Sequence, residues 1–343
     1  MRSLADPFRT VHGSLRDAEA TAFAIVKNEM YFIRSFLDHH RRLGVEQFII
    51  LDDQSKDGTR EYVVAQDDCF VIESPFAFGE PVQLPGPEGG RRMRAGIAFK
   101  SLIPQRYLLH RYGLYLDADE YLVLPEGIAT IVELIDLLKR HEIRSVAAGL
   151  IDFFPASVSD LDTPRDLATS EAMLGAHPYF DAVPLLGAKP GKPFPTKVSK
   201  GTTARLFREH GIRLVPEAMR GAPRWLNRLL PYKFPKSSVL KTPLVRWDPG
   251  VEYLNSHRAN VPASKHVLLG LAHLKFTHDL ARRIDYALAS KAYTRGSEKY
   301  LWYAQLLESM RRGNPSFLGP KSKRYATPAD LASAGLTRLA LGG

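Results

Sequence analysis

The sequence predicts an α/β fold in which a mostly parallel sheet is sandwiched between helices. Between residues 21 and 151, apolar strand-like segments alternate with amphipathic helical segments. The strand-like segments are apolar at almost every position, as is typical of parallel strands buried on both faces. Polar side chains, most of them acidic, follow three of these segments, and the carboxyl ends of parallel strands are where such sheets bind ligands.

The elements follow from periodicity and from their end signals. In the first helix, Met30, Ile33 and Leu37 share one face, and Gly44 ends it. In chain order we predict strands at 21–26, 46–51, 69–73, 113–116 and 145–151, and helices at 29–43, 59–65, 92–103 and 128–140.

The second half is less regular. Residues 154–200 lose periodicity and are rich in Pro, Gly, Ser and Asp, which predicts a flexible loop or lid. Strand-like pieces follow at 203–207, 239–247 and 267–276, and then a helical region at 280–310. The basic tail from Arg311 onward is expected to be partly mobile.

Composition limits the class of protein. With 343 residues, 45% of them hydrophobic, the chain can bury a core. The net charge of +10 fits nucleic acid, anionic lipid or a phosphorylated small molecule, and does not choose among them. The single cysteine, Cys69, excludes an intrachain disulfide. Because no apolar stretch is long enough for a membrane span or resembles a signal peptide, we expect a cytoplasmic protein with peripheral contact to an anionic membrane.

An apolar strand ends in three carboxylates, Asp117, Asp119 and Glu120. Strand residues alternate sides, so Asp117 and Asp119 point the same way, and a cation or protons must offset their repulsion. Hard oxygen ligands of this kind suit Mn²⁺ or Mg²⁺. A second Asp-x-Asp, at Asp160 and Asp162, has no strand before it and indicates a solvated turn.

Polar residues also follow the first two strands. Lys27-Asn28-Glu29 follows the first, and Asp52-Asp53 ends the second. Carboxylates placed there can accept hydrogen bonds from a nucleobase or a ribose. Asp57-Gly58-Thr59 is typical of a turn that caps the next helix.

Four motifs of the chain, taken in order, resemble those of the family 2-like glycosyltransferases with the GT-A (Rossmann-like) fold, in particular a bacterial branch. They are Val26-Lys27-Asn28-Glu29, Leu43-Gly44-Val45, Asp52 to Thr59 and Asp117-Ala118-Asp119-Glu120. The resemblance is clear over residues 21–125. It is weaker over 196–310, where Ser256-His257-Arg258-Ala259-Asn260 and Leu271-Ala272-His273-Leu274-Lys275-Phe276 are similar to later elements of the family.

The resemblance implies a nucleotide-diphosphate sugar donor, UDP-linked, and a divalent metal ion. It implies donor binding by Asn28, Glu29, Asp52, Asp53, Arg94, Asp117 and Lys275. It implies Mn²⁺ or Mg²⁺ binding by Asp117, Asp119 and His273, with His257 as an alternative histidine. Further phosphate candidates are Lys197, Lys241 and Arg205, whereas His39 and His40 are expected to be structural.

An inverting transfer needs a base, usually a carboxylate. The common family motif for it is absent, as is the signature of processive enzymes, so we expect a non-processive enzyme. We predict Asp248 as the base, with Glu252 and Asp152 as alternatives.

The expected organisation is a donor-binding half (20–153), the loop or lid (154–200), an acceptor-side half with C-terminal helices (201–312) and the basic tail (313–343). The expected acceptor is a hydroxyl of a glycan, a lipid-linked sugar or a cell-envelope polysaccharide. One alternative is a nucleotidyltransferase acting on sugar phosphates, although no glycine-rich loop follows the first strand. Another is a non-enzymatic polyanion-binding protein, although the cations are dispersed and we expect no nucleic acid partner.

Overall fold

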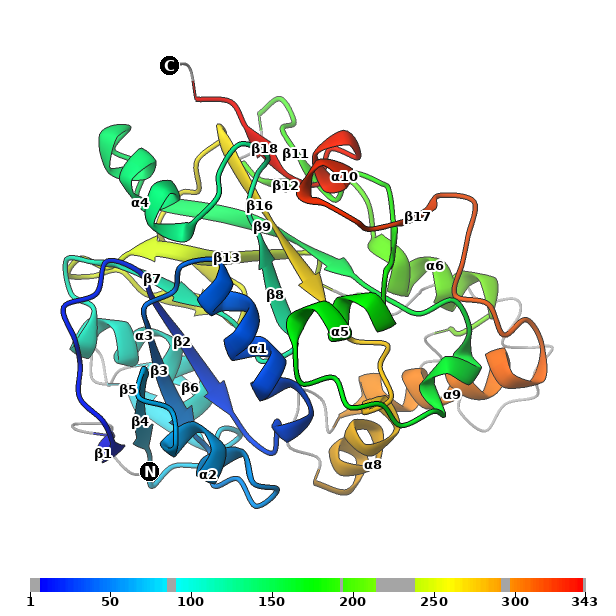
Figure 1. The fold of residues 1–343 in the computed structure, drawn as a ribbon, viewed down its shortest axis with the longest axis horizontal. Helices are drawn as coiled ribbons and strands as arrows, with labels where there is room; N and C mark the ends of the chain where they lie inside the picture. The colour runs from blue at the N-terminus through cyan, green and yellow to red at the C-terminus, as the bar shows by residue number, and fades with distance from the viewer. Residues whose placement is uncertain (1–6, 85–90, 192–193, 214–237, 291–296, 342–343) are drawn as a thin grey trace.

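A central sheet with helices on both faces forms the body of the molecule (Figure 1). The computed structural model describes residues 7–84, 91–191, 194–213, 238–290 and 297–341. Within these residues the sheet has ten strands, both parallel and antiparallel. The predicted α/β fold is therefore confirmed. No helix of the described residues is long and apolar enough to cross a membrane.

The main sheet has the order β1 (Arg9–His12), β4 (Cys69–Glu73), β3 (Gln47–Asp52), β2 (Thr21–Val26), β7 (Tyr112–Tyr115), β13 (Leu240–Arg246), β9 (Ser145–Asp152), β16 (Val267–His273) and β18 (Arg338–Leu339), and β8 (Glu120–Val123) also pairs with β16. The helices are α1 (Met30–Arg42), α2 (Thr59–Val64), α3 (Ala95–Tyr107), α4 (Ile131–Arg140), α5 (Ser170–Ala176), α6 (Gly201–Glu209), α8 (Leu280–Ser290), α9 (Glu298–Arg312), α10 (Pro328–Ser333) and the 3₁₀ helix η2 (Val158–Leu161). Two-stranded sheets pair β5 (Pro81–Leu84) with β6 (Arg91–Arg94), β10 (Tyr179–Asp181) with β17 (Ser322–Arg324), β11 (Leu186–Gly187) with β12 (Thr196–Lys197), and β14 (Tyr253–Asn255) with β15 (Arg258–Ala259).

The direction of the strands brings several carboxyl ends together. Strands β4, β3, β2 and β7 are parallel neighbours. Strand β13 runs antiparallel between β7 and β9, and its Leu244 lies opposite both Leu114 and Val146. Strand β9 therefore runs in the same direction as β7, and β16 is parallel to β9. The carboxyl ends of β2, β3, β7, β9 and β16 thus share one edge, which we call the carboxyl edge.

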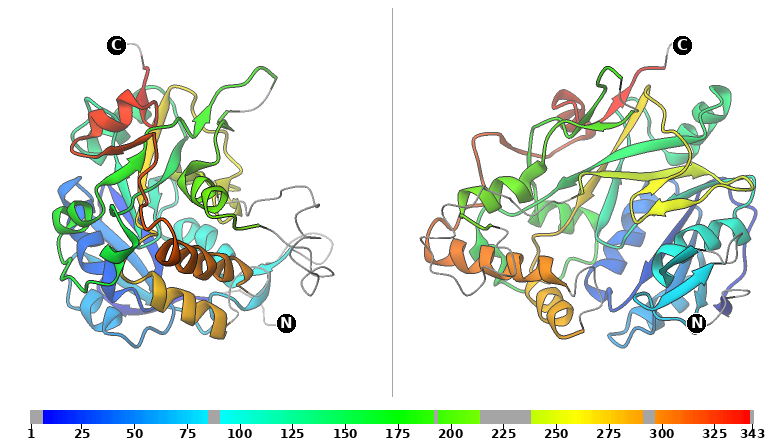
Figure 2. Two further views of the ribbon diagram at one scale, coloured as in Figure 1. Left: turned by 90° about the vertical axis from the view of Figure 1, so that its right-hand side faces the viewer. Right: turned by 180° about the vertical axis from the view of Figure 1, so that it is seen from behind.

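Alternation along the strands divides the core between the two faces of the sheet. On β2, Ala22 and Ala24 belong to a cluster with α1, α4 and α5, whereas Phe23 belongs to a second cluster with α3. Figure 2 shows α3 on the face seen from behind. A third cluster joins α6, α8, α9 and η2 around Phe276.

Two expectations about secondary structure are wrong. Residues 203–207 form part of α6 and not a strand, because Thr203, Leu206 and Phe207 are buried at helical spacing. Residues 154–200 are not without regular structure, since they contain η2, α5 and β10 to β12.

The ends of other elements also need correction. Residues 92–94 belong to β6, and α3 begins only at Ala95. The helical region 280–310 forms α8 and α9, and residues 291–296 lie outside the described residues. The tail, expected to be partly mobile, supplies β17, α10 and β18, and β18 pairs with β16 of the main sheet.

Candidate functional site

Hydrogen bonds tie together the turns that follow β2 and β3. The backbone N–H of Asn28 donates to Ser55 Oγ (2.9 Å), and Lys56 N donates to Asn28 Oδ1 (2.8 Å). Glu29 N donates to Thr59 Oγ1 (2.9 Å). Asn28 has a φ of 55°, in the left-handed region that asparagine tolerates. The side chain of Asn28 therefore helps to shape this turn.

The two adjacent carboxylates at the end of β3 have different environments. The Asp52 side chain is fully enclosed and lies 3.5 Å from Arg60 Nη1. Asp53 Oδ2 lies 3.1 Å from Lys27 Nζ, and Asp53 Oδ1 accepts a hydrogen bond from Phe78 N (3.1 Å). Burial raises the pKa of Asp53, and Lys27 opposes this shift. Asp52 Oδ1 also accepts a hydrogen bond from Ser55 N (3.1 Å) and so supports the turn, whereas Asp53 has the phosphate-compatible cation Lys27 beside it.

The loop that contains Phe78 lies between Asp53 and the segment of Arg94, because Phe78 O accepts from Gly96 N (2.9 Å). Arg94 is the last residue of β6 and pairs with Pro81 at the start of β5. The loop before β5 contains Phe78, whose N–H reaches Asp53.

Asp117 is an open carboxylate with buried cations behind it. Its side chain is 41% exposed, whereas that of Lys241, 3.1 Å away, is fully buried. Tyr115 donates its hydroxyl hydrogen bond to Asp117, and its ring lies 4.1 Å from Lys241 Nζ and 4.4 Å from Lys100 Nζ. Burial raises the pKa of Asp117, but Lys241 and Lys100 outweigh this effect and keep the pKa below its usual range. Asp117 is thus ionised and accessible to a ligand.

Asp119, in the turn between β7 and β8, is buried beside two cationic groups. Arg283 Nη2 donates to Asp119 Oδ2 (2.7 Å), and His273 Nε2 lies 3.6 Å from the same oxygen. His273 Nδ1 lies 3.1 Å from Asp152 Oδ1. Burial and Lys275 lower the pKa of His273, but Asp119 and Asp152 outweigh them and raise it to about 9.

The side chains around Asp119 can bind a divalent ion only if other ligands complete its coordination shell. Among the described residues, no three His, Cys, Asp or Glu side chains form a group that holds a metal ion by themselves. Asp119 and His273 face each other, and Asp152 orients the imidazole as carboxylates do in metal sites. With Asp117 open nearby, the remaining ligands would be phosphate oxygens and water, as is usual for Mg²⁺.

The structure does not bring Asp248 to the carboxyl edge. Asp248 follows β13, whose Arg246 lies opposite Tyr112 at the start of β7, whereas Asp117 follows the end of β7. Its carboxylate contacts Arg144 instead (3.0 Å). We therefore do not retain Asp248 as a candidate base.

The two alternative bases differ in position. Glu252 contacts Arg91 (3.4 Å) and none of the strand-end residues described above. Asp152 lies at the carboxyl edge, where it accepts hydrogen bonds from Lys275 Nζ (2.7 Å) and Thr203 Oγ1 (2.6 Å). Because these partners favour its ionised form, Asp152 is better suited to positioning its neighbours than to taking a proton.

Sequence reasoning missed three cations at the site. Arg283 binds Asp119, and Arg282 Nη2 donates to Asn28 O (3.0 Å). With Lys27 they line a crevice of about 20 Å³. Lys100 is the third, and its position on a buried face of α3 was the available signal. The adjacent arginines of α8 carried no such signal.

Comparisons with known proteins give matches among solved structures alone. No family model matches the chain, and no curated protein matches it. One similar solved structure is the mannosyltransferase PcManGT from Pyrobaculum calidifontis in complex with GDP-Man and Mn²⁺, with 16% sequence identity and a TM-score of 0.27. The match covers 43% of this chain and 40% of that chain, so the chain spans less than half the length of this relative.

Proposed function

We propose that the protein is a metal-dependent glycosyltransferase that binds a nucleotide-diphosphate sugar at the carboxyl edge. One observation carries this proposal: Asp53, Asp117, Asp119 and His273, which belong to three separate motifs, converge on one edge of the sheet. In open α/β sheets this edge is the usual ligand site.

The cations at the edge suit a diphosphate. Lys27, Arg282 and Arg283 line the crevice beside Asn28 and Glu29. Because its volume of about 20 Å³ has room for one water molecule, a diphosphate would lie at the mouth of the crevice, where arginine can bind phosphate through paired hydrogen bonds. Asp53 is proposed to accept from the nucleoside of a UDP-linked donor, and Arg94 is proposed to bind the same donor. Lys275 is proposed to act indirectly, since its ammonium group is bound to Asp152.

Asp117, Asp119 and His273 are proposed to hold Mn²⁺ or Mg²⁺, and His273 would release the proton from Nε2 as the ion binds. The ion would offset the charge that develops on the leaving diphosphate. Lys241 and Lys100 keep Asp117 ionised, and Asp152 holds the imidazole of His273 in place. The proposed reaction is an inverting, non-processive transfer to a hydroxyl of a glycan, a lipid-linked sugar or an envelope polymer.

Substitution of Asp119 tests the proposal. In a screen of UDP- and GDP-sugars, Asp119→Asn should lower Mn²⁺-dependent donor hydrolysis or transfer by at least roughly 100-fold, because a charge is lost from the metal site. The matched control is Asp162→Asn, in the second Asp-x-Asp, where the side chain is 57% exposed and paired with Arg311. Melting temperatures of both variants report on folding. Full activity of a folded Asp119→Asn variant across a Mn²⁺ titration would overturn the proposed metal role.

A further inference from the structure

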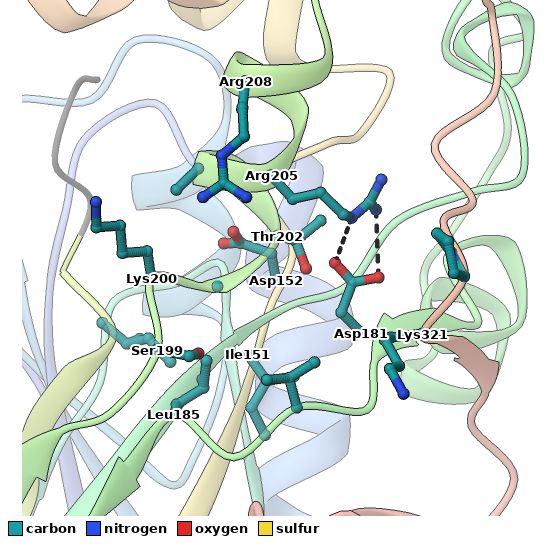
Figure 3. Close-up of a pocket in the computed structure, with 15 residues that line it drawn as sticks. Ile151, Asp152, Asp181, Leu185, Ser199, Lys200, Thr202, Arg205, Arg208 and Lys321 are labelled. Carbon is teal, nitrogen blue, oxygen red and sulfur yellow. Dashed lines mark hydrogen bonds and ion pairs between the residues drawn. The ribbon is translucent and has the colours of Figure 1, made fainter. Parts of the chain in front are cut away.

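A cavity of about 430 Å³ lies next to the carboxyl edge (Figure 3). Its walls come from the end of β9, the segment between Asp181 and Leu185, the start of α6, and Pro320 and Lys321 of the tail. Leu150, Ile151 and Leu185 supply apolar wall. This size is within the range of small-molecule sites.

The two buried carboxylates of the cavity are already neutralised. Asp181 is paired with Arg205 (2.7 Å), as the dashed lines in Figure 3 show. Asp152 is paired with Lys275 (2.7 Å). These pairs contribute little net charge to the cavity.

Three further cations line the cavity, and they belong to Lys200, Arg208 and Lys321. All three residues are exposed. Among the described residues, neither Lys200 nor Lys321 has an ion-pair partner. The cavity therefore has a positive potential that favours an anion.

One hydroxyl group among the residues that line the cavity is buried without a hydrogen-bond partner among the described residues, and it belongs to Ser199. Thr202, only 3% exposed, also lines the cavity. Both residues flank the start of α6, where Lys200 provides no side-chain cap. Buried hydroxyls require partners, and the positive end of the helix dipole favours an anion as the partner.

Asp152 connects this cavity to the proposed donor site. Its Oδ2 accepts from Thr203 N (3.1 Å) in the first turn of α6, and its Oδ1 lies 3.1 Å from His273 Nδ1. His273 in turn faces Asp119. A molecule in the cavity would therefore lie beside the donor.

We propose that the cavity binds an anionic group of the sugar acceptor, either a phosphate ester or a carboxylate. The acceptor assignment rests on the proposed function, whereas anion binding itself rests on the cavity. Lys200, Arg208 and Lys321 attract the anion, Ser199 and Thr202 donate hydrogen bonds to it, and the apolar wall contacts the carbon skeleton.

Calorimetric titration of the full chain tests the proposal with glucose 6-phosphate, glucuronate and glucose as probes. We expect one or both anionic sugars to bind, and glucose to bind at least about tenfold more weakly, the scale of a lost charged hydrogen bond. The Lys200→Gln/Arg208→Gln variant should bind the anionic probes about tenfold or more weakly. The control is Arg140→Gln/Lys265→Gln, which removes the same charges from exposed positions outside the cavity.

Parallel titrations with UDP and GDP in the presence of Mn²⁺ separate the two proposals. Nucleotide affinity should be the same in the cavity variant as in the wild type. Equal binding of glucose and the anionic sugars, or an equal effect of the control, would overturn the anion site. If the cavity variant lost as much affinity for the nucleotides as for the anionic sugars, the assignment of the cavity to the acceptor would be overturned. A wild type that binds the anionic sugars but no nucleotide would overturn the proposed function, and the acceptor assignment with it.

Discussion

His273 is the residue at which the two parts of the site meet. Its two ring nitrogens face different carboxylates, Asp119 and Asp152. The sequence identified His273 because it is a polar interruption in an apolar strand. The structure adds the carboxylate behind it, which sets the orientation of the ring.

If His273 supports the metal site, His273→Ala should raise the Mn²⁺ concentration for half-maximal activity by about 10-fold or more. His266→Ala is the control, because His266 is exposed just before the same strand. The measurement is activity over a Mn²⁺ titration, alongside melting of the metal-free proteins. A destabilised His273→Ala protein with an unchanged Mn²⁺ requirement would show that the residue is structural only.

At this scale, prediction succeeded where a side chain directly follows a buried strand. Asp117 and Asp119 were identified because an apolar strand precedes them. Asp248 was misplaced because its Asp-Pro-Gly context indicates a turn but not the end of the sheet at which that turn lies. Arg283 was missed because its position beside Asp119 depends on how α8 packs, which local sequence does not reveal.

At the scale of elements, two histidines join α1 to strand β8. His39 Nε2 donates to Leu122 O (2.7 Å), and Leu122 N donates to His40 Nε2 (3.2 Å). These contacts confirm the predicted structural role of His39 and His40. Burial lowers the pKa of His40 well below its usual value, so the folded state holds it neutral.

Removal of His40 should therefore cost stability in a pH-dependent way. At pH 8, His40→Leu should lower the free energy of unfolding by about 1–3 kcal/mol, because Leu122 N loses its acceptor. Below about pH 6.5 the unfolded state binds a proton at His40 that the folded state does not. The wild type thus loses stability as the pH falls, and the variant should lose less.

Chemical denaturation from pH 8 to pH 5 measures this difference. His141→Leu, at an exposed position after α4, should retain the wild-type pH dependence. Identical pH slopes in the wild type and His40→Leu would contradict the expected neutral state.

Element prediction depended on the length of the periodic segment. The strands and helices between residues 21 and 151 were found because each shows a sustained pattern. The sequence of α6 predicts a strand at 203–207 because five residues are too few to separate the two periods. The position of β13 within the sheet was not predictable, since pairing partners are distant in sequence.

At the scale of the whole molecule, the segment of residues 154–200 is anchored to α1. Ser170 N and Oγ both donate to Asp38 of α1 (2.8 Å each). Binding of UDP or GDP with Mn²⁺ should increase hydrogen-exchange protection of this segment, as expected for a lid that excludes water. Helix α4 serves as the internal reference, and equal protection of 154–200 in both states would refute a donor-coupled lid.

The position of β13 has a consequence for how the molecule is made. Strand β9 pairs with β13 and β16, both of which are synthesised more than eighty residues after it, and β7 also receives β13 on one side. A nascent chain that has reached only residue 153 therefore exposes the unpaired backbone of both strands, a template for wrong pairing with other chains. Completion of the sheet must wait until β13, β16 and β18 leave the ribosome, so the two halves mature as one cooperative unit and expression of the first half alone should yield aggregates.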